Sequence, residues 1–472
     1  MIVKNPEGNS DAGSNDVIVL EFNELCPGLM DKLIGEGKLP NFSRLRDSSL
    51  AMITDADEDP PNLEPWIQWA TIHSGLKAEE HRVFDLGEGR KIEQDCVAKI
   101  LSNNGVKVGV LGSMNTNYRD LNGFFVPDPW DLAGNAEPSS LQPFYETVAK
   151  QVQDSSKDEG LSKKDLMGFG WFMLKHGMKP STVWAGMKQL MSEFKNKAVS
   201  WRRPMILERL QFDFFCHLKK KYKTRFNTFF CNSTAHFQHY YWRNMEPEIF
   251  TLPPSEQDDK SLQFAIEEGY RHLDQIVGKF FSKFPESSIV LLTALSQKPW
   301  RETTKCTFRP ADFDAFLKFC GLGNSQVEVK PVMAEEFYLV CSSDEEKSMA
   351  KEKIMQLTMD GEPIMKARDE DEGLFCGCII NDYPGDNRVL KHPDGGETEF
   401  GDLLHMVHSM RSGRHHPHGL FWSPSKNPRI VEESIPLEDV APTLLGLFNV
   451  DPPEYMTGKN VEAETLEPAL AN

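Results

Sequence analysis

The sequence predicts an α/β protein whose mostly parallel central sheet is flanked by helices. Short β-branched and aliphatic runs, typical of buried parallel strands, recur along the chain. Helical patterns with one apolar face separate these runs. Strand and helix alternate in the opening third of the chain and again after residue 226. This alternation is typical of an open sheet with right-handed crossover connections.

The first predicted strand is DVIVLEFNEL (16–25), a β-branched run that ends in polar residues. Behind it, apolar residues recur at helical spacing between Leu29 and Leu45. A further helix is expected through CVAKILSNNG (96–105), and VKVGVLG (106–112) is the next clear strand. This order predicts strand–helix–strand units in the first part of the core.

The same pattern returns later in the chain. NTFFCNST (227–234) and SSIVLLTALS (287–296) are predicted strands, and an amphipathic helix is expected between them over 261–284. Near the end, IPLEDVAPTLLGLFNV (435–450) predicts a turn followed by a short helix with Pro442 in its first turn.

Two stretches interrupt this predicted core. One is rich in Lys and Met and has a helical pattern. The other contains EFYLV, EEKSMAKEKIMQL and GLFCGCII, which predict a strand–helix–strand unit and hence a small α+β cap. We therefore expect five segments: an N-terminal part of the core (1–154), a helical insertion (155–225), a continuation of the core (226–304), the cap insertion (305–400) and a C-terminal part of the core (401–472).

The charge balance argues against a general nucleic-acid binder. The 472 residues include 52 Lys and Arg against 71 Asp and Glu, a formal net charge of -19, whereas nucleic-acid binding needs a basic face. WRR (201–203) and KKKYKTR (219–225) leave open a local basic patch, for which a solvated helix end is the simpler interpretation. We expect no nucleic-acid partner.

Hydropathy and cysteine content suggest a cytoplasmic protein. No apolar run reaches the ~18 residues of a membrane span. The polar opening MIVKNPEGNSDAGSND does not have the apolar stretch of a signal peptide. The nine cysteines are an odd number without a regular framework, so we expect reduced thiols.

Polar residues at predicted strand ends mark the candidate site, because ligands of such sheets bind at the carboxyl ends of the strands. Four places qualify: residues 21–24, the LEPW segment, Asn232 to His239, and Thr293 to Gln297. A fifth feature is GRHHPHG (413–419), whose three histidines could form a metal cluster, a pH switch or a solvated loop.

Six phrases in order resemble the type I phosphodiesterase/nucleotide pyrophosphatase branch of the alkaline phosphatase superfamily. The resemblance implies the fold of that superfamily, and a site in which two divalent metals clamp a phosphoryl group. The phrases are GKLPNFSRL (37–45), EPWIQWATIHSGLKAEEHRVFDLG (64–87), TAHFQHYYW (234–242), TALS (293–296), GRHHPHG (413–419) and DVAPTLLGLFNV (439–450).

The chain departs from this family at the catalytic positions. Glu21 stands where the family has a first-strand Asp, and Leu63 aligns with its Thr or Ser nucleophile. Apolar residues replace three further ligands of the family: Ala235, Ala294 and Leu295. The resemblance therefore implies a divergent site that is depleted of metal ligands.

Two histidine ligands of the family remain, His239 and His415. With Glu21 they could hold one divalent metal, zinc or manganese, whereas the two-metal site is not expected. His236, His416 or His418 could supply a missing ligand.

A rebuilt site would use general acid–base chemistry. Glu21 or Glu64 could act as the base, and His239 or His415 as the acid or as a stabiliser of an oxyanion. For Trp66 and its neighbour Trp69, packing in the core is an equally good interpretation. Substrate binding is predicted for Asn23, Asn62, Trp66, Asn115 and Gln297.

The resulting functional prediction is a divergent phosphodiesterase- or phosphatase-like hydrolase or transferase. Its substrate would be a small-molecule or glycan phosphate (or sulfate) ester of a nucleotide or sugar. The alternative is a catalytically inactive protein that binds a ligand on the same fold. A third hypothesis is a glycan-modifying transferase with a Trp-rich pocket. The sequence does not indicate the oligomeric state.

Overall fold

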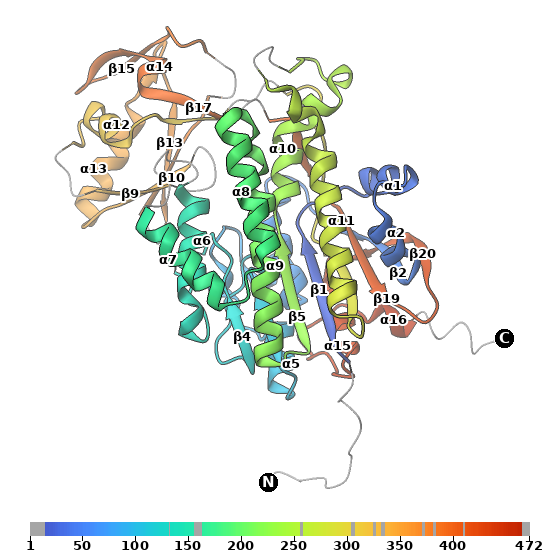
Figure 1. The fold of residues 1–472 in the computed structure, drawn as a ribbon. Helices are drawn as coiled ribbons and strands as arrows, with labels where there is room; N and C mark the ends of the chain where they lie inside the picture. Colours follow the sequence, from blue (N-terminus) through green and yellow to red (C-terminus); the bar gives the residue numbers. More distant parts are fainter. Residues whose placement is uncertain are drawn as a thin grey trace, which may run out of the picture.

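The computed structural model describes residues 15–464 except 132, 155–162, 255–257, 304–306, 324–326, 332–335, 371–372, 381–383 and 409–410. Its centre is a twisted eight-stranded sheet that lies between two layers of helices (Figure 1). A smaller unit of strands and helices stands beside one end of this sheet.

The central sheet is mostly parallel, which confirms the predicted fold class. Strand β19 runs antiparallel to its neighbours β2 and β6, and the other adjacent pairs are parallel. The strands lie in the order β20 (Arg429–Pro436), β2 (Ser49–Asp55), β19 (His418–Pro424), β6 (Ser288–Thr293), β1 (Val17–Phe22), β5 (Phe226–Cys231), β3 (Val108–Leu111) and β4 (Gly123–Val126).

Strand β1 shows why the sheet needs helices on both faces. All six of its residues are buried. Ile18, Leu20 and Phe22 pack in one hydrophobic cluster, whereas Val17 and Val19 pack in the other. Side chains of a strand alternate between faces, so a strand with buried apolar side chains on both faces requires cover on each side.

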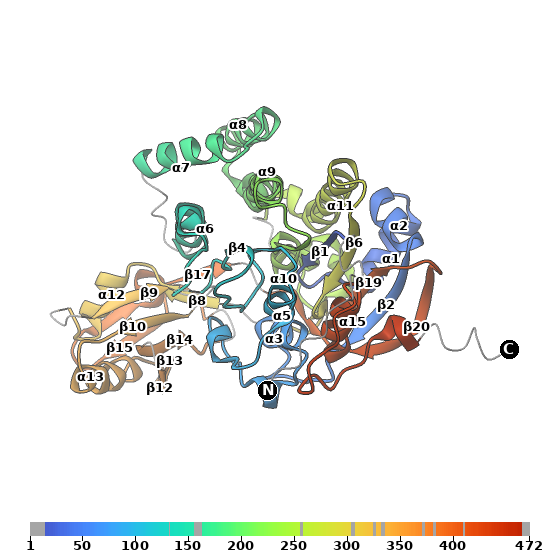
Figure 2. The same cartoon turned by 90° about the horizontal axis from the view of Figure 1, so that it is seen from below.

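The two helical layers are visible in the view from below (Figure 2). The face that carries Ile18 and Leu20 packs against one group of helices: α1 (Pro27–Gly35), α2 (Pro40–Asp47), α9 (Arg203–Tyr222), α10 (Ser233–Met245) and α11 (Ala265–Lys283). The opposite face packs against α3 (Pro65–Ser74), α5 (Val97–Asn103) and α15 (Val440–Gly446).

The GKLPNF phrase has a structural role at the start of α2. Asp274 on α11 accepts hydrogen bonds from the backbone N–H groups of Asn41 and Phe42 at 2.8 and 2.9 Å. Its second carboxylate oxygen accepts from Asn41 Nδ2 at 2.8 Å. The buried carboxylate thus caps the first turn of α2, where N–H groups have no partner within the helix.

The smaller unit has its own hydrophobic core, centred on buried residues such as Phe337, Leu374 and Ile354. Two four-stranded sheets build it. One contains β13 (Met365–Glu370), β14 (Gly373–Cys378), β10 (Phe337–Val340) and β9 (Glu328–Pro331). The other contains β12 (Glu362–Pro363), β11 (Thr358–Met359), β15 (Val389–His392) and β16 (Gly396–Glu399). Its helices are α12 (Phe313–Phe319), α13 (Asp344–Met355) and α14 (Phe400–Leu403), and the pair β8 (Thr307–Pro310) and β17 (Leu404–His408) leads into and out of it.

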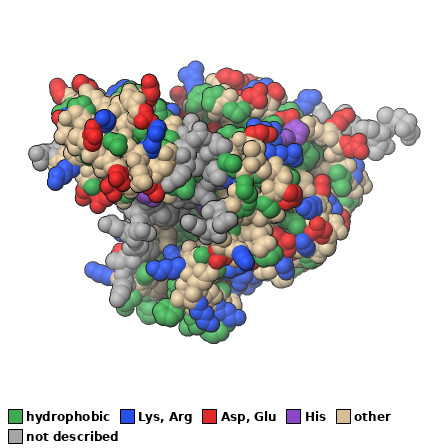
Figure 3. Space-filling model, turned by 90° about the horizontal axis from the view of Figure 1, so that it is seen from above, with side chains coloured by type: hydrophobic (Ala, Val, Ile, Leu, Met, Phe, Trp, Pro, Cys, Tyr) green, Lys and Arg blue, Asp and Glu red, His purple; other side chains and the backbone are tan. Residues whose placement is uncertain are grey.

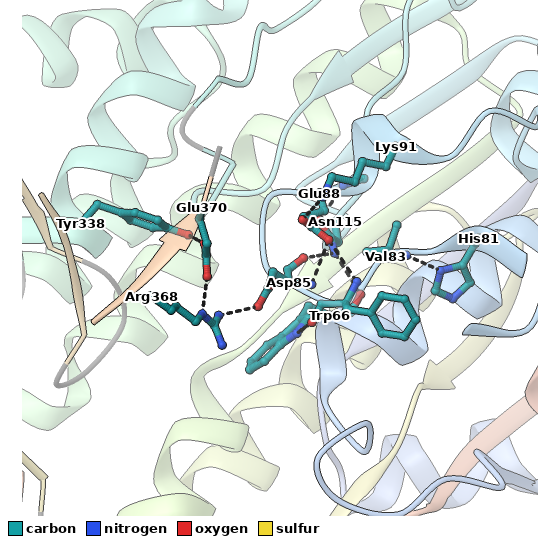
Figure 4. A network of polar contacts seen from close by, with 12 residues as sticks. Trp66, His81, Val83, Asp85, Glu88, Lys91, Asn115, Tyr338, Arg368 and Glu370 are labelled. Carbon is teal, nitrogen blue, oxygen red and sulfur yellow. Dashed lines mark hydrogen bonds and ion pairs between the residues drawn. The ribbon is translucent and has the colours of Figure 1, made fainter. Parts of the chain in front are cut away.

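A polar bridge joins this unit to the core (Figure 4). Arg368 on β13 donates to Asp85 of the core at 3.0 Å and also contacts Glu370. Tyr338 on β10 donates to the other oxygen of Glu370 at 2.6 Å. The Arg368 guanidinium therefore lies between Asp85 of the core and Glu370 of the smaller unit.

Helices α7 (Lys163–Lys175) and α8 (Pro180–Lys195) project from the body of the protein (Figure 2). The following helix, α9, belongs to the core, because Phe212, Phe214 and Phe215 are buried in the main cluster. The remaining helices are α4 (Ala78–His81), α6 (Gln142–Asp154) and α16 (Val461–Glu464). Among the described helices, none is long and apolar enough to cross a membrane.

The cysteines that the structure describes are free thiols. Cys376 and Cys378 of the CGC motif are both buried in β14. Cys376 belongs to the core of the smaller unit. The motif is therefore part of the packing of a strand.

Candidate metal centre at the carboxyl ends of the strands

Glu24 occupies the loop just beyond the end of β1. Its backbone has φ = 60°, in the left-handed region that non-glycine residues seldom adopt. The side chain is buried, and its Oε1 accepts a hydrogen bond from Asn23 Nδ2 at 2.9 Å. Its backbone carbonyl accepts from Gln238 Nε2 on α10 at 2.6 Å. These contacts fix the carboxylate and hold the Glu24 backbone in a conformation that is strained for a residue other than glycine.

Two histidines converge on Glu24 from distant parts of the chain. His239 lies on α10, and its Nε2 is 3.1 Å from Glu24 Oε2. His415 lies on β18 (Gly413–His416), and its Nε2 is 3.5 Å from the same oxygen. One ligating atom from each residue lies within 4.8 Å of the others. The carboxylate and the two imidazoles thus form a compact group.

Strand β18 is placed by its antiparallel pairing with β7 (Ser296–Pro299), in which His415 stands opposite Gln297. Gln297 Nε2 donates to Glu24 Oε2 and, at 2.9 Å, to the backbone carbonyl of Ala235. Gly413 permits this close approach, because a Cβ there would lie 2.2 Å from Gln297 Oε1. The strand pair therefore positions both Glu24 and His415.

The protonation states suit a cation. Burial alone would raise the pKa of Glu24, but the facing imidazoles and the Gln297 amide lower this pKa to about 2. Burial lowers the pKa of His415 to about 4, and the proximity of His239 adds to this effect. At neutral pH an ionised carboxylate therefore faces a neutral imidazole.

The tautomer of His415 leaves a lone pair on the atom that faces Glu24. His415 Nδ1 lies 2.9 Å from the backbone carbonyl of Leu63 and donates to it. In the neutral ring Nε2 then carries no hydrogen. Nε2 is buried and, among the residues that the structure describes, has no hydrogen-bond partner. Two acceptors that face each other in a buried site repel unless a cation lies between them.

The spacing fits a divalent metal ion. Tetrahedral zinc with ligands at about 2.0–2.1 Å places neighbouring ligand atoms about 3.3 Å apart. The separations of 3.1 and 3.5 Å from Glu24 Oε2 to the two imidazoles lie on either side of this value. Three protein ligands would leave a fourth position for water or substrate, as in catalytic sites. His239 is partly exposed, so solvent reaches the group.

Glu21, which the sequence predicts as ligand and base, lies elsewhere. It is within β1, and its side chain points to the face that α3 covers, where Oε1 lies 3.7 Å from His73 Nε2. Desolvation raises its pKa to about 8, although a hydrogen bond from Ser113 opposes the shift. The prediction of Glu21 as a ligand is thus corrected to Glu24, because alternation along β1 turns Glu21 toward α3.

Glu64 and Asn62 flank Leu63, the residue that the resemblance aligns with a nucleophile. Glu64 Oε2 lies 3.4 Å from His415 Nδ1, so this carboxylate adjoins the group. Leu63 between them is buried and contributes its carbonyl to His415. The backbone carbonyl of Asn62 accepts a hydrogen bond from Gln68 Nε2 at 2.8 Å. Of this segment, the structure brings Glu64 and the Leu63 carbonyl to His415.

Two residues predicted to bind substrate have structural contacts instead (Figure 4). Asn115 Nδ2 donates to the carbonyls of Trp66 and Asp85, each at 3.1 Å, and its Oδ1 accepts from the Gly89 N–H at 2.9 Å. Trp66 is half-buried, and its Nε1 donates to the carbonyl of Phe84 at 2.9 Å. The amide of Asn115 thus holds loops together, and Trp66 packs beside the core.

Asn23 and Gln297 support the group rather than face open space. Asn23 Nδ2 also donates to Asn232 Oδ1 at 2.8 Å, and its Oδ1 accepts from the indole N–H of buried Trp69 at 2.9 Å. Trp69 therefore has the core position that the alternative interpretation gave it. The contacts of Asn23 and Gln297 orient the Glu24 carboxylate, as the outer partners of metal ligands do.

The other histidines of the two motifs lie outside the group. His416 and His418 contact each other, with ring centroids 4.8 Å apart, and His418 Nε2 lies 3.4 Å from Asp55. His236 packs against Tyr240, with ring centroids 4.9 Å apart. Ala294 and Leu295, which the resemblance aligns with an Asp–His pair, are fully buried. The GRHHPHG motif thus supplies one ligand, His415.

The polarity of the EFNEL segment was the signal that could have identified Glu24. This segment offers two glutamates, and only the second lies past the strand end. A residue beyond the last paired position is free to turn toward the edge of the sheet, where ligands bind.

In comparisons with known proteins, this chain is similar to several solved structures. No family model and no curated protein sequence matches the chain. The chain is similar to a variant of the alkaline phosphatase PafA, with 12% identity over 95% of this chain and 99% of the other and a TM-score of 0.47. It is also similar to murine ectonucleotide pyrophosphatase/phosphodiesterase 5, with 9% identity over 96% of this chain and 100% of the other and a TM-score of 0.41. The human counterpart gives 9% identity over 95% and 99% of the two chains and a TM-score of 0.40.

Proposed function

We propose that the protein binds one divalent metal ion, zinc or manganese, through Glu24, His239 and His415, and acts on a phosphate ester. The buried Nε2 of His415 carries this proposal. It presents a lone pair to an ionised carboxylate, and within the described residues it has no hydrogen-bond partner. A site of this kind is stable when a cation lies between the two acceptors.

A bound divalent ion would supply Lewis-acid chemistry: it polarises a phosphoryl oxygen and lowers the pKa of a bound water. The chain itself supplies the negative charge of Glu24, the neutral imidazole of His415 and the imidazole of His239. The Leu63 carbonyl fixes the tautomer of His415, and Gln297 fixes the carboxylate. These groups prepare a binding position before substrate arrives.

The reaction that we propose is a direct displacement by water or by an acceptor alcohol. Leu63 has no hydroxyl with which to form a covalent intermediate. The bond between phosphorus and the attacking oxygen forms while the ester bond breaks. Glu64, beside His415, accepts the proton of the attacking hydroxyl, and the leaving alkoxide takes a proton from solvent. With water the outcome is hydrolysis, and with an alcohol it is transfer.

The substrate class rests on the six phrases that resemble the phosphodiesterase branch. They favour a phosphate (or sulfate) ester of a nucleotide or a sugar, bound at the carboxyl edge of the sheet.

A second candidate function is ligand binding without catalysis. Leu63, Ala235, Ala294 and Leu295 are all buried and apolar at positions where the family carries catalytic groups. A metal held by Glu24 and the histidines could then be structural.

Metal analysis and an activity screen separate the two functions. Untagged protein is measured for zinc and manganese and assayed with aryl phosphate, aryl phosphodiester and aryl sulfate esters. We expect one metal per chain, lost in His239→Ala and in His415→Ala but kept in His236→Ala, which changes a histidine of α10 outside the group. Metal without turnover of any ester would support ligand binding. Metal-free wild-type protein without turnover would overturn the metal-dependent function and leave ligand binding without a metal.

A further inference from the structure

Helices α7 and α8 expose an apolar surface that the candidate metal centre does not use. We call it the α7–α8 surface, and it consists of Leu166, Met167, Trp171 and Leu174 on α7 and of Val183, Trp184, Met187, Leu190, Met191 and Phe194 on α8. Phe194 is 94% exposed, Met167 77% and Trp171 63%. Exposed apolar residues occur singly on most proteins, but ten of them on two successive projecting helices mark an interaction site.

The exposed residues form one stripe along each helix. On α7, Met167, Trp171 and Leu174 are separated by four and then three positions. On α8 the same spacing begins at Trp184 and ends at Phe194. Residues at this spacing share one face of a helix, so each helix presents an apolar face to its surroundings.

Polar contacts on the inner face hold α8 in this orientation. Thr182 Oγ1 donates to Asp213 of α9 at 2.6 Å, and Gln189 Nε2 donates to the Val199 carbonyl at 2.9 Å. Glu193 accepts from the guanidinium of Arg203 at 2.6 Å. Helix α8 therefore buries Thr182, Gln189 and Glu193 and exposes its large apolar side chains, the reverse of an ordinary surface helix. Turning the apolar face inward would break these contacts.

The charge of this region is opposite to that of the whole chain. Residues 164–197 contain six lysines and two acidic residues, a net charge of +4, whereas the chain carries -19. Lys175 Nζ lies 5.2 Å from the Trp171 ring and Lys188 Nζ 5.5 Å from the Trp184 ring. Along the edge of the molecule that carries these helices, hydrophobic and basic side chains lie together (Figure 3).

We propose that the α7–α8 surface docks onto an anionic lipid bilayer. The apolar stripe would enter the boundary between headgroups and acyl chains, with the tryptophans at that boundary and the lysines on lipid phosphates. A second copy of the chain is a poorer occupant, because it would bring two surfaces of charge +4 together. The acidic remainder of the protein is repelled by such a membrane, so the surface also sets the orientation of docking.

Vesicle flotation tests this proposal with the full chain. Vesicles of phosphatidylcholine alone are compared with vesicles of equal parts phosphatidylcholine and phosphatidylglycerol. We expect binding to the anionic vesicles that weakens as salt is added. The double variant Trp171→Glu with Phe194→Glu should abolish binding.

A second variant tests the lysines without changing the apolar stripe. Lys188→Gln with Lys195→Gln should lower partitioning about 25-fold, because each lysine near an anionic surface contributes about fivefold. Ile430→Glu is the matched control, since Ile430 is an exposed apolar residue of β20, away from α7 and α8, and should leave binding unchanged.

Two results would overturn the proposal. One is the absence of flotation of the wild-type chain with anionic vesicles. The other is a wild-type dimer in light scattering that Trp171→Glu with Phe194→Glu converts to monomer, which would identify the surface as a contact between copies. Thermal unfolding of each variant confirms that its loss of binding does not come from loss of fold.

Discussion

Glu24 Oε2 and His239 Nε2 lie 3.1 Å apart, although Glu24 follows strand β1 and His239 lies on helix α10, which follows strand β5. A hydrogen bond from the imidazole of His239 to the carboxylate is one account of this distance. A shared metal ion is the other, and it also explains the lone pair of His415.

Glu24→Gln should separate these accounts. The amide keeps the shape of the side chain but removes the charge that a divalent ion needs. We expect metal affinity to fall by at least the ~10–100-fold that changes to outer partners of metal ligands cause. Isothermal titration of metal-stripped protein with zinc measures it. Glu79→Gln, at an exposed glutamate of α4, is the control. Equal affinity of Glu24→Gln and wild type would exclude Glu24 as a ligand.

Gly413→Ala should disturb the same centre through the backbone. The added Cβ would lie 2.2 Å from Gln297 Oε1 and 2.5 Å from the Gln238 carbonyl. We expect a loss of about 1–3 kcal/mol in unfolding free energy, as for overpacked sites, together with weaker metal binding. Gly35→Ala is the matched control, because a Cβ at that helical position meets no atom within 4 Å. Urea unfolding and metal titration of both variants test this, and normal metal binding by Gly413→Ala would contradict the strand-pair account.

Glu21 predicts a pH dependence of stability. Desolvation raises its folded-state pKa from 4.5 to about 8. Between these values the folded chain keeps a proton that the unfolded chain has lost, so this residue makes stability fall as pH rises. The slope is at most about 1.4 kcal/mol per pH unit.

Glu21→Gln should remove this contribution, since an amide resembles the neutral carboxyl. Urea unfolding is measured at several pH values between 4.5 and about 8. The unfolding free energy of the variant should rise relative to that of wild type as pH rises. Burial lowers the pKa of neighbouring His73 to about 3, which gives the opposite slope, but both proteins share it. A constant difference between variant and wild type would contradict a buried neutral carboxyl at position 21.

Asp274→Ala should destabilise the fold without affecting the metal centre. The carboxylate accepts three hydrogen bonds at the start of α2. Removal of the carboxylate leaves the N–H groups of Asn41 and Phe42 without a partner, and a buried donor without a partner costs about 1–3 kcal/mol. We expect a loss of about 2–4 kcal/mol in unfolding free energy by chemical denaturation, with zinc affinity unchanged. Altered zinc affinity would show that α2 and the centre are coupled.

The sequence predicts the central sheet well and the site in part. Strands such as β1 and β6 are short apolar runs that match buried parallel strands, so local pattern and fold agree. His239 and His415 were predicted from motif order, and the structure brings them together. Glu24 was not identified as a ligand, because the left-handed turn that places it depends on Gln238 and Gln297, which are distant in sequence.

Patterns of local polarity were less informative in the smaller unit. Strand β13 reads MKARDE and is largely exposed, so its sequence has neither an apolar run nor a strict alternation. It forms a strand because it pairs with β14, although its own residues do not have a strand pattern. The exposure of the apolar face of α8 could not be predicted from the sequence either, since helical spacing alone does not say which face of a helix packs against the core.

The carbonyl of Leu63 has a consequence for redesign. It anchors His415 through the backbone, so any side chain at this position leaves the anchor in place. Leu63→Thr would replace a buried apolar side chain by a smaller one that carries a hydroxyl. Position 63 is thus a place at which a hydroxyl can be introduced next to Glu64 in the sequence, and gain of ester turnover in Leu63→Thr would show that this hydroxyl reaches the substrate.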